Sequence, residues 1–315
     1  MDDGDKLHDL SIIDFAELFG ATEEEITRFC GDQIANLDFR HRNIEGKEKE
    51  QLILKVLKHI DSENRTVAGH ERLPAWEKGW SENLQEFVES RYDIDKLFPK
   101  YFKKNVPVRL NRNYVMPIHE DFVLNVTKLF RSWLYQKYFQ EAENIYEFGC
   151  GSAHHLAYLA ILFPDKKLHG FDWAETSRQI IRLLAQHYGW SIQGGCFDFF
   201  HPDETLNIRP NSAVFTFGAL EQVGKNHEYF LEFLLRKSPE LCVNVEGLSE
   251  LYEQDYLLDY LALKYHKRRN YLDGFLTRLR ELEEEEKIEI IKVHHQQFGN
   301  LFDDPHSYVI WKPKK

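Results

Sequence analysis

The spacing of apolar residues divides the chain into two parts. Up to about residue 139, apolar positions recur three or four residues apart, which is the spacing of one helix face, and few stretches alternate as strands do. Helices are therefore predicted over residues 11–19, 22–34, 47–60, 75–92 and 119–139. Ser11 and the capping-box sequence Thr22–Glu25 supply side-chain acceptors that typically begin the first two of these helices.

From residue 144 onward, short apolar strands alternate with helices. Strands are predicted over residues 145–148, 167–171, 191–197, 213–217, 241–245, 288–294 and 307–311. Helices are predicted between them at 155–162, 175–188 and 227–235. Strand–helix alternation with right-handed crossovers predicts an α/β fold with a doubly wound, mostly parallel, seven-stranded sheet. The turn-rich segment before the last strand predicts an antiparallel hairpin at the sheet edge.

These two patterns also predict the domain organisation. Residues 1–118 are expected to form a helical N-terminal cap on the substrate side, and residues 119–315 an α/β domain. A helical insertion is expected at about 249–286, after the fifth strand of the sheet. Aromatic residues make up 14% of the chain, which supplies enough apolar area for a sizeable core.

The charge balance excludes some classes of partner. The chain has 52 acidic and 40 basic residues and a formal net charge of −12. An acidic surplus of this size argues against nucleic acid and against anionic membrane surfaces, because both carry charge of the same sign. We therefore expect a small molecule as the partner.

Cysteine usage and the first residues indicate the compartment. Cys30, Cys150, Cys196 and Cys242 are far apart and form no CxxC pair, so neither a disulfide framework nor a zinc ribbon is predicted. The dispersed His residues show no ligand spacing, and no metal is expected. The chain starts without the features of a signal peptide and has no apolar run long enough to span a membrane, so a cytoplasmic protein is expected.

The clearest chemical motif follows the first predicted strand, where residues 145–153 read IYEFGCGSA. Gly149 and Gly151 allow a tight turn and the close approach of a ligand, and the following helix offers free N–H groups. A dinucleotide fingerprint would need a third glycine at position 154, which is His154 here. A nicotinamide- or flavin-dependent oxidoreductase is therefore disfavoured.

The segment resembles the first motif of class I S-adenosylmethionine-dependent methyltransferases, (D/E)-x-G-x-G-x-(G/A). The residues in the defined positions are Glu147, Gly149, Gly151 and Ala153. Three further elements follow where this family has them: Asp172, which ends the second strand 23 residues after Gly149, Asp198–Phe199 after the third strand, and Phe217–Gly218 after the fourth. The predicted strand order with its final antiparallel hairpin agrees with the same family over residues 144–315.

The resemblance implies S-adenosylmethionine as the cofactor and a role for each matching residue. The residues that would shape the cofactor loop are Glu147, Gly149, Cys150 and Gly151. Asp172 would accept hydrogen bonds from the ribose hydroxyls, and Trp173 would flank the adenosine. The remaining positions would be Asp198 and Phe199 at the adenine, and Phe217 and Gly218 on the methionine side.

The sequence leaves the catalytic residues open. Methyl transfer from a sulfonium depends mainly on alignment and needs a general base only when the nucleophile must lose a proton. Gln222 stands where many members of the fold have a histidine, which puts a histidine base from that loop in doubt. The candidates are His155, Glu221 and Glu246, and each could instead be a helix-turn or capping residue.

Candidates on the substrate side come from several regions: Trp76 in the cap, Arg112 before the α/β domain, Gln222 after the fourth strand, and His266 and Arg269 in the insertion. The basic and aromatic segment at 264–271 is an exception in an acidic chain and could neutralise a phosphate or carboxylate of the substrate. The alternatives are core packing for Trp76, which shares a helix face with Trp80, and a solvated helix face for the basic segment.

The sequence therefore predicts an enzyme, an S-adenosylmethionine-dependent methyltransferase that methylates an oxygen or nitrogen of a small or medium-sized acceptor. A metabolite is favoured. Residues 265–283 (YHKRRNYLDGFLTRLRELE) and 307–313 (SYVIWKP) resemble those of uncharacterised bacterial methyltransferases, and because some of these are associated with cell-surface saccharide assembly, the resemblance suggests a saccharide-related acceptor. The alternative is a catalytically inactive methyltransferase-like protein that binds partners through its helical half. The acceptor atom and the oligomeric state are not predicted.

Overall fold

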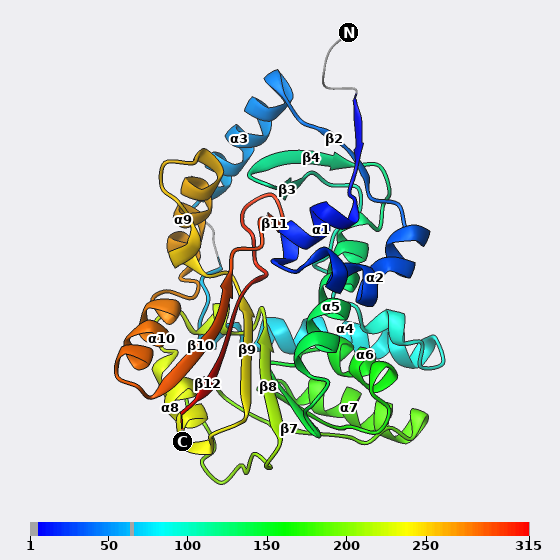
Figure 1. The fold of residues 1–315 in the computed structure, drawn as a ribbon, viewed down its shortest axis with the longest axis vertical. Coiled ribbons are helices and arrows are strands. Elements are labelled where there is room, and N and C mark those ends of the chain that lie inside the picture. The colour runs from blue at the N-terminus through cyan, green and yellow to red at the C-terminus, as the bar shows by residue number, and fades with distance from the viewer. Residues whose placement is uncertain (1–5, 64–65, 315) are drawn as a thin grey trace.

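A seven-stranded sheet forms the centre of the computed structural model, which describes residues 6–63 and 66–314 (Figure 1). Its strands, in order across the sheet, are β7 (Ile192–Cys196), β6 (Lys167–Asp172), β5 (Asn144–Phe148), β8 (Ser212–Phe217), β9 (Leu241–Glu246), β12 (Ser307–Pro313) and β10 (Ile288–His294). The strands from β7 to β9 pair in parallel, whereas β12 is antiparallel to β9 and β10. The predicted α/β fold and its final hairpin are confirmed.

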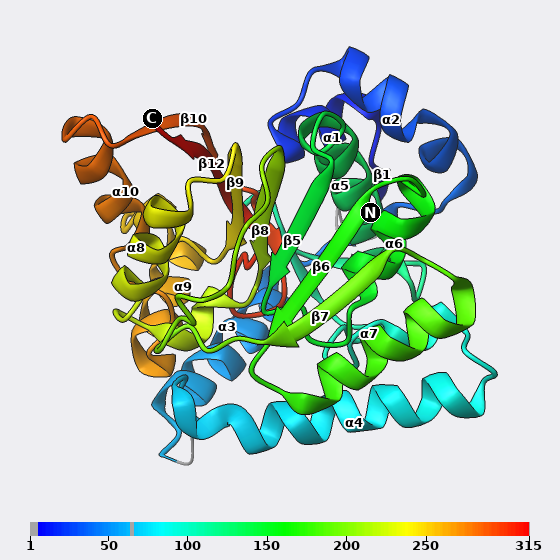
Figure 2. The ribbon, with the colours of Figure 1, turned by 90° about the horizontal axis from the view of Figure 1, so that it is seen from below.

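Helices cover both faces of this sheet, because the strands of a parallel sheet are apolar on both sides (Figure 2). One face carries α5 (Phe122–Tyr138), α6 (His154–Leu162) and α7 (Glu175–Tyr188), in one core with Ile145. The other carries α8 (Glu228–Lys237) and α10 (Phe275–Glu284), in a core with Tyr146. Neighbouring residues of β5 therefore point to opposite cores, as the pleat of a strand requires.

The N-terminal part contains the predicted helices and, in addition, a second sheet. The helical elements are α1 (Ile12–Phe19), α2 (Glu23–Asn36), α3 (Gly46–Asp61), α4 (Leu73–Glu89) and the 3-10 turns η2 (His70–Arg72) and η3 (Ile94–Leu97). Ser11 and Thr22 form the capping boxes of α1 and α2. The strands are β1 (Leu7–Asp9), β2 (Arg40–Asn43), β3 (Val108–Leu110) and β4 (Asn113–Pro117). The cap is thus not built of helices alone, because strands this short show no detectable alternation.

The second sheet ties the C-terminal end of the chain to the N-terminal part. Its order is β1-β2-β4-β3-β11, and β11 (Phe298–Gly299) lies in the connection between β10 and β12 (Figure 1). Phe298 of this connection packs against Phe122 of α5, which also meets Phe39 of the N-terminal part. One continuous core therefore contains residues from both parts of the chain.

Two helical segments flank the carboxyl ends of the parallel strands. The predicted insertion consists of η5 (Ser249–Leu251), α9 (Leu257–Arg269) and α10, and the loop after β8 contains η4 (Leu220–Val223). The apolar side of α9 packs against α3, with Leu261 and Val56 in one cluster. The second flanking segment, α4, runs beside α7 (Figure 2). Glu77 of α4 accepts a hydrogen bond from the backbone N–H of Thr176, at 3.1 Å, and another from the hydroxyl of Thr176.

Candidate active site

A cavity opens at the carboxyl ends of β5, β6, β7 and β8, where parallel α/β sheets generally bind ligands. It encloses about 680 Å³, its open mouth included. Of the site residues predicted from the sequence, twelve line it: Trp76, Glu147, Gly149, Cys150, Gly151, His155, Asp172, Trp173, Phe199, Phe217, Gly218 and Gln222. The cavity therefore brings together residues that are separated by more than 140 positions in the chain.

The glycine loop between β5 and α6 has the left-handed backbone that glycine permits. The φ angles of Gly149 and Gly151 are 77° and 51°. A Cβ on Gly149 would lie 2.2 Å from the Cβ of Ala219, and one on Gly151 would lie 2.6 Å from Cζ2 of Trp80. Ala153 is also left-handed, with a φ of 58°, a conformation that costs a non-glycine residue about 1 kcal/mol. Both glycines are thus required by the packing of the protein's own side chains.

The carboxylate of Asp172, at the end of β6, holds the glycine loop in place. Its Oδ2 accepts a hydrogen bond from the backbone N–H of Gly151, and its Oδ1 accepts one from Ala174, both at 2.8 Å. Burial raises the pKa of Asp172 to about 6, although these two hydrogen bonds oppose the shift. Because each carboxylate oxygen can accept more than one hydrogen bond, Asp172 can hold the loop and a ligand hydroxyl together.

Several buried polar atoms around the cavity lack a partner among the described residues. Glu147, at the end of β5, is 1% exposed, and its Oε2 accepts no hydrogen bond. Burial, together with the charge of Asp172, raises the pKa of Glu147 well above its usual range. Oε1 of Gln222 and the indole Nε1 of Trp76 are also buried and unpaired. Because buried polar groups are nearly always hydrogen-bonded, a molecule or a water in the cavity would supply the partners that these three atoms lack.

Aromatic rings form the end of the cavity beside β6 and β7, where Trp173 and Phe200 are among the lining residues. His70 of η2 meets both rings edge-on, with centroid distances of 5.9 and 5.8 Å. Asp198 does not line the cavity. Its Oδ1 accepts a hydrogen bond from the backbone N–H of Phe200 at 2.9 Å, and its Oδ2 lies 3.1 Å from Nδ1 of His201 and 3.6 Å from Nε2 of His70. This end therefore offers flat apolar faces, with a carboxylate beside them.

His155 lies at the opposite end of the cavity, beside Phe217. Their ring centroids are 4.3 Å apart, and Nδ1 of His155 shares a hydrogen bond of 2.7 Å with the hydroxyl of Tyr135. Burial lowers the pKa of His155 well below its usual range, so the imidazole is uncharged at neutral pH. A Cβ on Gly218 would meet no atom within 4 Å, so the loop after β8 leaves open space here.

Glu221 and Glu246, the other two catalytic candidates, stand outside the lining of the cavity. Glu246 is fully buried at the end of β9 and accepts a hydrogen bond from the backbone N–H of Ala219 at 3.2 Å, which stabilises the loop after β8. Glu221 accepts one from Nε2 of Gln222 at 2.7 Å. Burial raises the pKa of Glu246 to about 7 and that of Glu221 to about 8.

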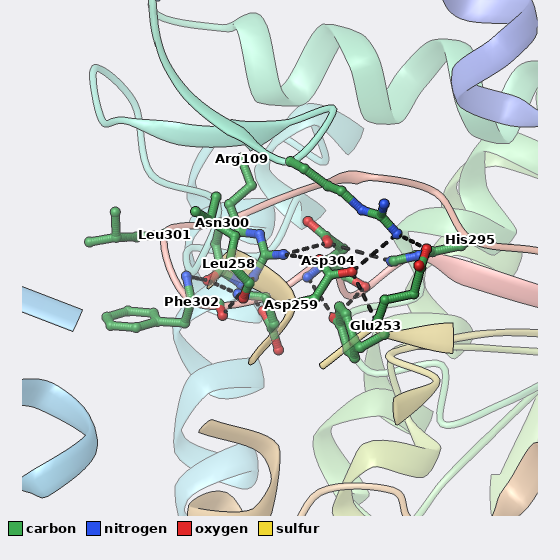
Figure 3. Close-up of polar contacts among 12 residues, drawn as sticks. Arg109, Glu253, Leu258, Asp259, His295, Asn300, Leu301, Phe302 and Asp304 are labelled. Atoms are coloured by element: carbon green, nitrogen blue, oxygen red, sulfur yellow. Dashed lines mark hydrogen bonds and ion pairs between the residues drawn. The ribbon is translucent and has the colours of Figure 1, made fainter. Parts of the chain in front are cut away.

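Arg112 does not line the cavity. It belongs to an ionic cluster around the buried Arg109 of β3, and Figure 3 shows Arg109 with Glu253, Asp259 and Asp304 of that cluster. Nη2 of Arg109 lies 3.2 Å from Oδ1 of Asp259 and 2.9 Å from Oδ2 of Asp304. Arg112 pairs with Glu253 and lies 3.3 Å from Oδ2 of Asp259. These five residues, here called the Arg109 cluster, join β3, α9 and the β10–β12 connection, so Arg112 has structural partners of its own.

The basic segment of the insertion is also used within the protein. Nε2 of His266 lies 3.0 Å from Oδ2 of Asp303, and both side chains are buried. Arg269 donates hydrogen bonds to the backbone carbonyl of Thr66 and to the hydroxyl of Tyr271. Neither His266 nor Arg269 lines the cavity.

Trp76 of the N-terminal part was predicted on the substrate side, but other residues from this part were not. Pro99 and Tyr101, in the loop after η3, line the cavity, and His70 of η2 contacts the lining residue Trp173. No periodic pattern marks such loop residues. The sequence signal for this side of the cavity was the i, i+4 spacing of Trp76 and Trp80. Both residues line the cavity, and their rings stack with centroids 5.4 Å apart.

The described part of the chain contains no cluster suited to a metal ion, because no three His, Cys, Asp or Glu side chains are grouped as ligands. Its cysteines are free thiols, and three of the four are buried. Each helix in residues 6–63 and 66–314 is too short or too polar for a membrane span.

No family model and no curated protein matches the sequence. Solved structures do match. Human N-acetylserotonin methyltransferase, solved with SAM, is 11% identical, with a TM-score of 0.40 over 61% of this chain and 56% of the human one. A SAM-dependent methyltransferase from Aquifex aeolicus is 16% identical, with a TM-score of 0.38 over 56% of this chain and 87% of that one. The cyclase SpnF is 10% identical, with a TM-score of 0.45 over 61% of this chain and 81% of that one.

The sheet itself identifies the fold. Numbered along the chain, its seven strands lie in the order 3-2-1-4-5-7-6, and the seventh is antiparallel to both neighbours. A glycine loop follows the first strand, and an acidic residue ends the second. The chain has the fold of class I S-adenosylmethionine-dependent methyltransferases.

Proposed function

We propose that this chain is an S-adenosylmethionine-dependent methyltransferase that acts on a small-molecule acceptor. The observation that carries the proposal is the convergence of three features on one cavity. These features are the left-handed glycine loop, the buried carboxylate of Asp172 and the unpaired oxygen of Glu147. They meet at the carboxyl ends of parallel strands, where this class of sheet binds its ligands.

The chemistry of the lining fits this cofactor. S-adenosylmethionine carries a sulfonium and an ammonium group, and the lining contains two carboxylates and neither lysine nor arginine. The faces of the aromatic rings also attract cations. Glu147 would receive the ammonium group, and Asp172 the ribose hydroxyls. The adenine would lie against Trp173 and Phe199, with Asp198 beside it.

The protein's task in methyl transfer is alignment. When bound, the cofactor supplies a methyl group that is already activated by the positive sulfur, so holding the acceptor in line provides most of the acceleration. Trp76, Trp80 and Tyr101 would cover the reacting groups from the N-terminal part and exclude water. Phe217 and Gly218 would line the methionine side chain.

His155 is the proposed base for a hydroxyl acceptor. With its hydrogen on Nδ1, donated to the oxygen of Tyr135, the neutral imidazole leaves Nε2 free to take a proton. An amine acceptor would lose its proton after transfer and needs no base in this position. A saccharide-related metabolite remains one of the acceptors to be tested.

Calorimetric titration with S-adenosylhomocysteine tests the cofactor assignment. Wild type is expected to bind, and Asp172→Ala to bind about tenfold to a hundredfold more weakly, because hydrogen bonds to a charged acceptor are each worth about 1.5–3 kcal/mol. Gly151→Arg is expected to abolish binding. Asp165→Ala, which changes an exposed carboxylate before the amino end of β6, is the control and should bind as wild type. No binding by wild type at millimolar ligand would refute the proposal.

A transfer assay then identifies the acceptor. Methyl-labelled cofactor is incubated with the protein and a fractionated metabolite extract, and the labelled product is isolated. Label in one class of compound is expected, and His155→Ala should reduce transfer to a hydroxyl without weakening cofactor binding. Cofactor binding without transfer to any fraction would favour a binding protein with the methyltransferase fold.

A further inference from the structure

A second cavity adjoins the first, between α2, α5, α6 and the loop after η3. It encloses about 1760 Å³, its open mouth included, and shares Pro99 and His154 with the first cavity. Its cationic lining residues are Lys96, Lys100, Lys103, Lys104, Lys128 and Arg131, against three acidic ones. This basic groove is a local reversal of charge in a chain with a net charge of −12.

Arg131 of α5 is a buried cation of the basic groove that makes no ion pair. Its side chain is 6% exposed, and Nε and Nη1 have no hydrogen-bond partner in the described part of the chain. The guanidinium carbon lies 4.2 Å from the ring centroid of Tyr158 and 5.8 Å from that of Phe98. Asp95 and Glu147 act on it only through space, and burial lowers the pKa of Arg131.

The burial of the Arg131 guanidinium without a counter-charge costs free energy that the protein's own contacts do not fully offset. Burying a charge without a hydrogen-bonded counter-charge is unfavourable, and contact with the ring of Tyr158 offsets only part of that cost. The planar guanidinium presents several donors in a fixed geometry that matches the oxygens of a phosphate or carboxylate. Binding such an anion in the groove would therefore supply the counter-charge that Arg131 lacks.

Lysines of the groove are available to reinforce such a site. The side chains of Lys96, Lys103 and Lys128 make no ion pair or hydrogen bond with the described residues. Lys104, by contrast, is paired at 2.7 Å with Asp121 and is more than half exposed. The charge of the groove is thus only partly neutralised by the protein itself.

We propose that the basic groove binds an anionic group, a phosphate or a carboxylate, of the methyl acceptor, with Arg131 as its central ligand. The reacting end of the acceptor then reaches the first cavity past His154, which lines both cavities. The identification of the ligand as the acceptor rests on the proposed function, whereas the anion site itself does not.

Titration of the full chain with inorganic pyrophosphate, without cofactor, tests the anion site. Wild type is expected to bind, and Arg131→Met to lose at least tenfold in affinity. Lys128→Met should lose less, because its ammonium is one of several around the groove. Lys55→Met is the matched control and should bind within twofold of wild type, because it removes an exposed lysine of α3 that does not line the groove. Absence of binding to wild type at millimolar pyrophosphate, or equal binding by Arg131→Met, would overturn the proposal.

Titration with S-adenosylhomocysteine distinguishes the acceptor's anion from the cofactor's own carboxylate. Arg131→Met is expected to bind this ligand as wild type does, and a tenfold loss would instead assign the guanidinium to the cofactor. A failure of wild type to bind S-adenosylhomocysteine would refute the proposed function. The pyrophosphate result would still stand in that case, because that titration contains no cofactor.

Discussion

Two buried arginines of this protein, Arg109 and Arg131, differ in whether the surrounding protein supplies a counter-charge. Arg109 is 1% exposed and lies between the carboxylates of Asp259 and Asp304, and it also donates to two backbone carbonyl oxygens (Figure 3). Arg131 is 6% exposed and rests on an aromatic ring with two nitrogens unpaired. Nε of Arg109 also lacks a partner among the described residues, so what separates the two arginines is the counter-charge: Arg109 has two carboxylates, whereas Arg131 has no ion-pair partner in that part of the chain.

The carboxylates show the same difference. Asp259 is fully buried and meets Arg109 and Arg112. Glu147 is equally buried but lines a cavity with one oxygen unpaired. Burial alone therefore does not distinguish a structural charge from one that binds a ligand. The distinction lies in whether the surrounding protein supplies the counter-charge.

Replacing Arg109 is expected to have the largest effect. Arg109→Met leaves Asp259 and Asp304 without their main counter-charge, and breaking a buried pair from one side costs about 3–5 kcal/mol. The free energy of unfolding, measured by urea denaturation, should fall by this amount. Adding Asp259→Asn and Asp304→Asn should restore part of the loss. A loss below about 1 kcal/mol, the range of exposed ion pairs, would contradict a structural role for the Arg109 cluster.

The second-largest expected effect is the change in cofactor affinity with pH. The pKa of Asp172 is raised to about 6, and ribose hydroxyls would bind its ionised form. Below that pH the carboxyl group must release its proton on binding, so affinity should rise as pH rises through about 6. Between pH 5 and 7 calorimetry with S-adenosylhomocysteine should show a gain of about tenfold, equivalent to about 1.4 kcal/mol. Asp172→Asn should bind weakly and without this dependence, and a gain toward acid pH would contradict the assignment.

Replacing Arg131 is expected to have the smallest effect on stability and the opposite sign to Arg109. Arg131→Met removes an unpaired buried charge, so the free energy of unfolding in the absence of anions should stay unchanged or rise by up to about 1 kcal/mol. Saturating pyrophosphate should reverse the order, because at a hundredfold excess over its Kd wild type gains about 2.7 kcal/mol, whereas a variant that binds tenfold more weakly gains only about 1.4 kcal/mol. A loss of stability above about 1 kcal/mol in anion-free buffer would mean that Arg131 is structural.

Much of the α/β part could be predicted from the sequence, because its signals are local. The seven strands follow from apolar runs, and the glycine loop follows from residues only two positions apart, Gly149 and Gly151. The capping boxes at Ser11 and Thr22 are likewise read from three neighbouring positions. Such signals do not depend on tertiary contacts, because they arise from backbone geometry within one helix, strand or turn.

The parts that could not be predicted depend on contacts between distant segments. The short strands β1 to β4 form because they pair with one another and with β11, which lies about 180 residues further along the chain than β4. Arg112, His266 and Arg269 have charges that suit a substrate, but the tertiary structure gives them partners elsewhere. Tyr101, which lines the cavity, and His70, which contacts the lining residue Trp173, carry no local signal and are positioned only by the packing of the cap.

The sequence by itself determined the order of strands and helices, the glycine loop and the acidic residue that ends the second strand of the sheet. Only the tertiary structure decided which charges are paired. Arg109 and Arg131 are the same residue type in the same acidic chain, and no spacing separates them. The physical reason is that the free energy of a buried charge depends on the counter-charges within a few ångströms, and folding brings those from anywhere in the chain.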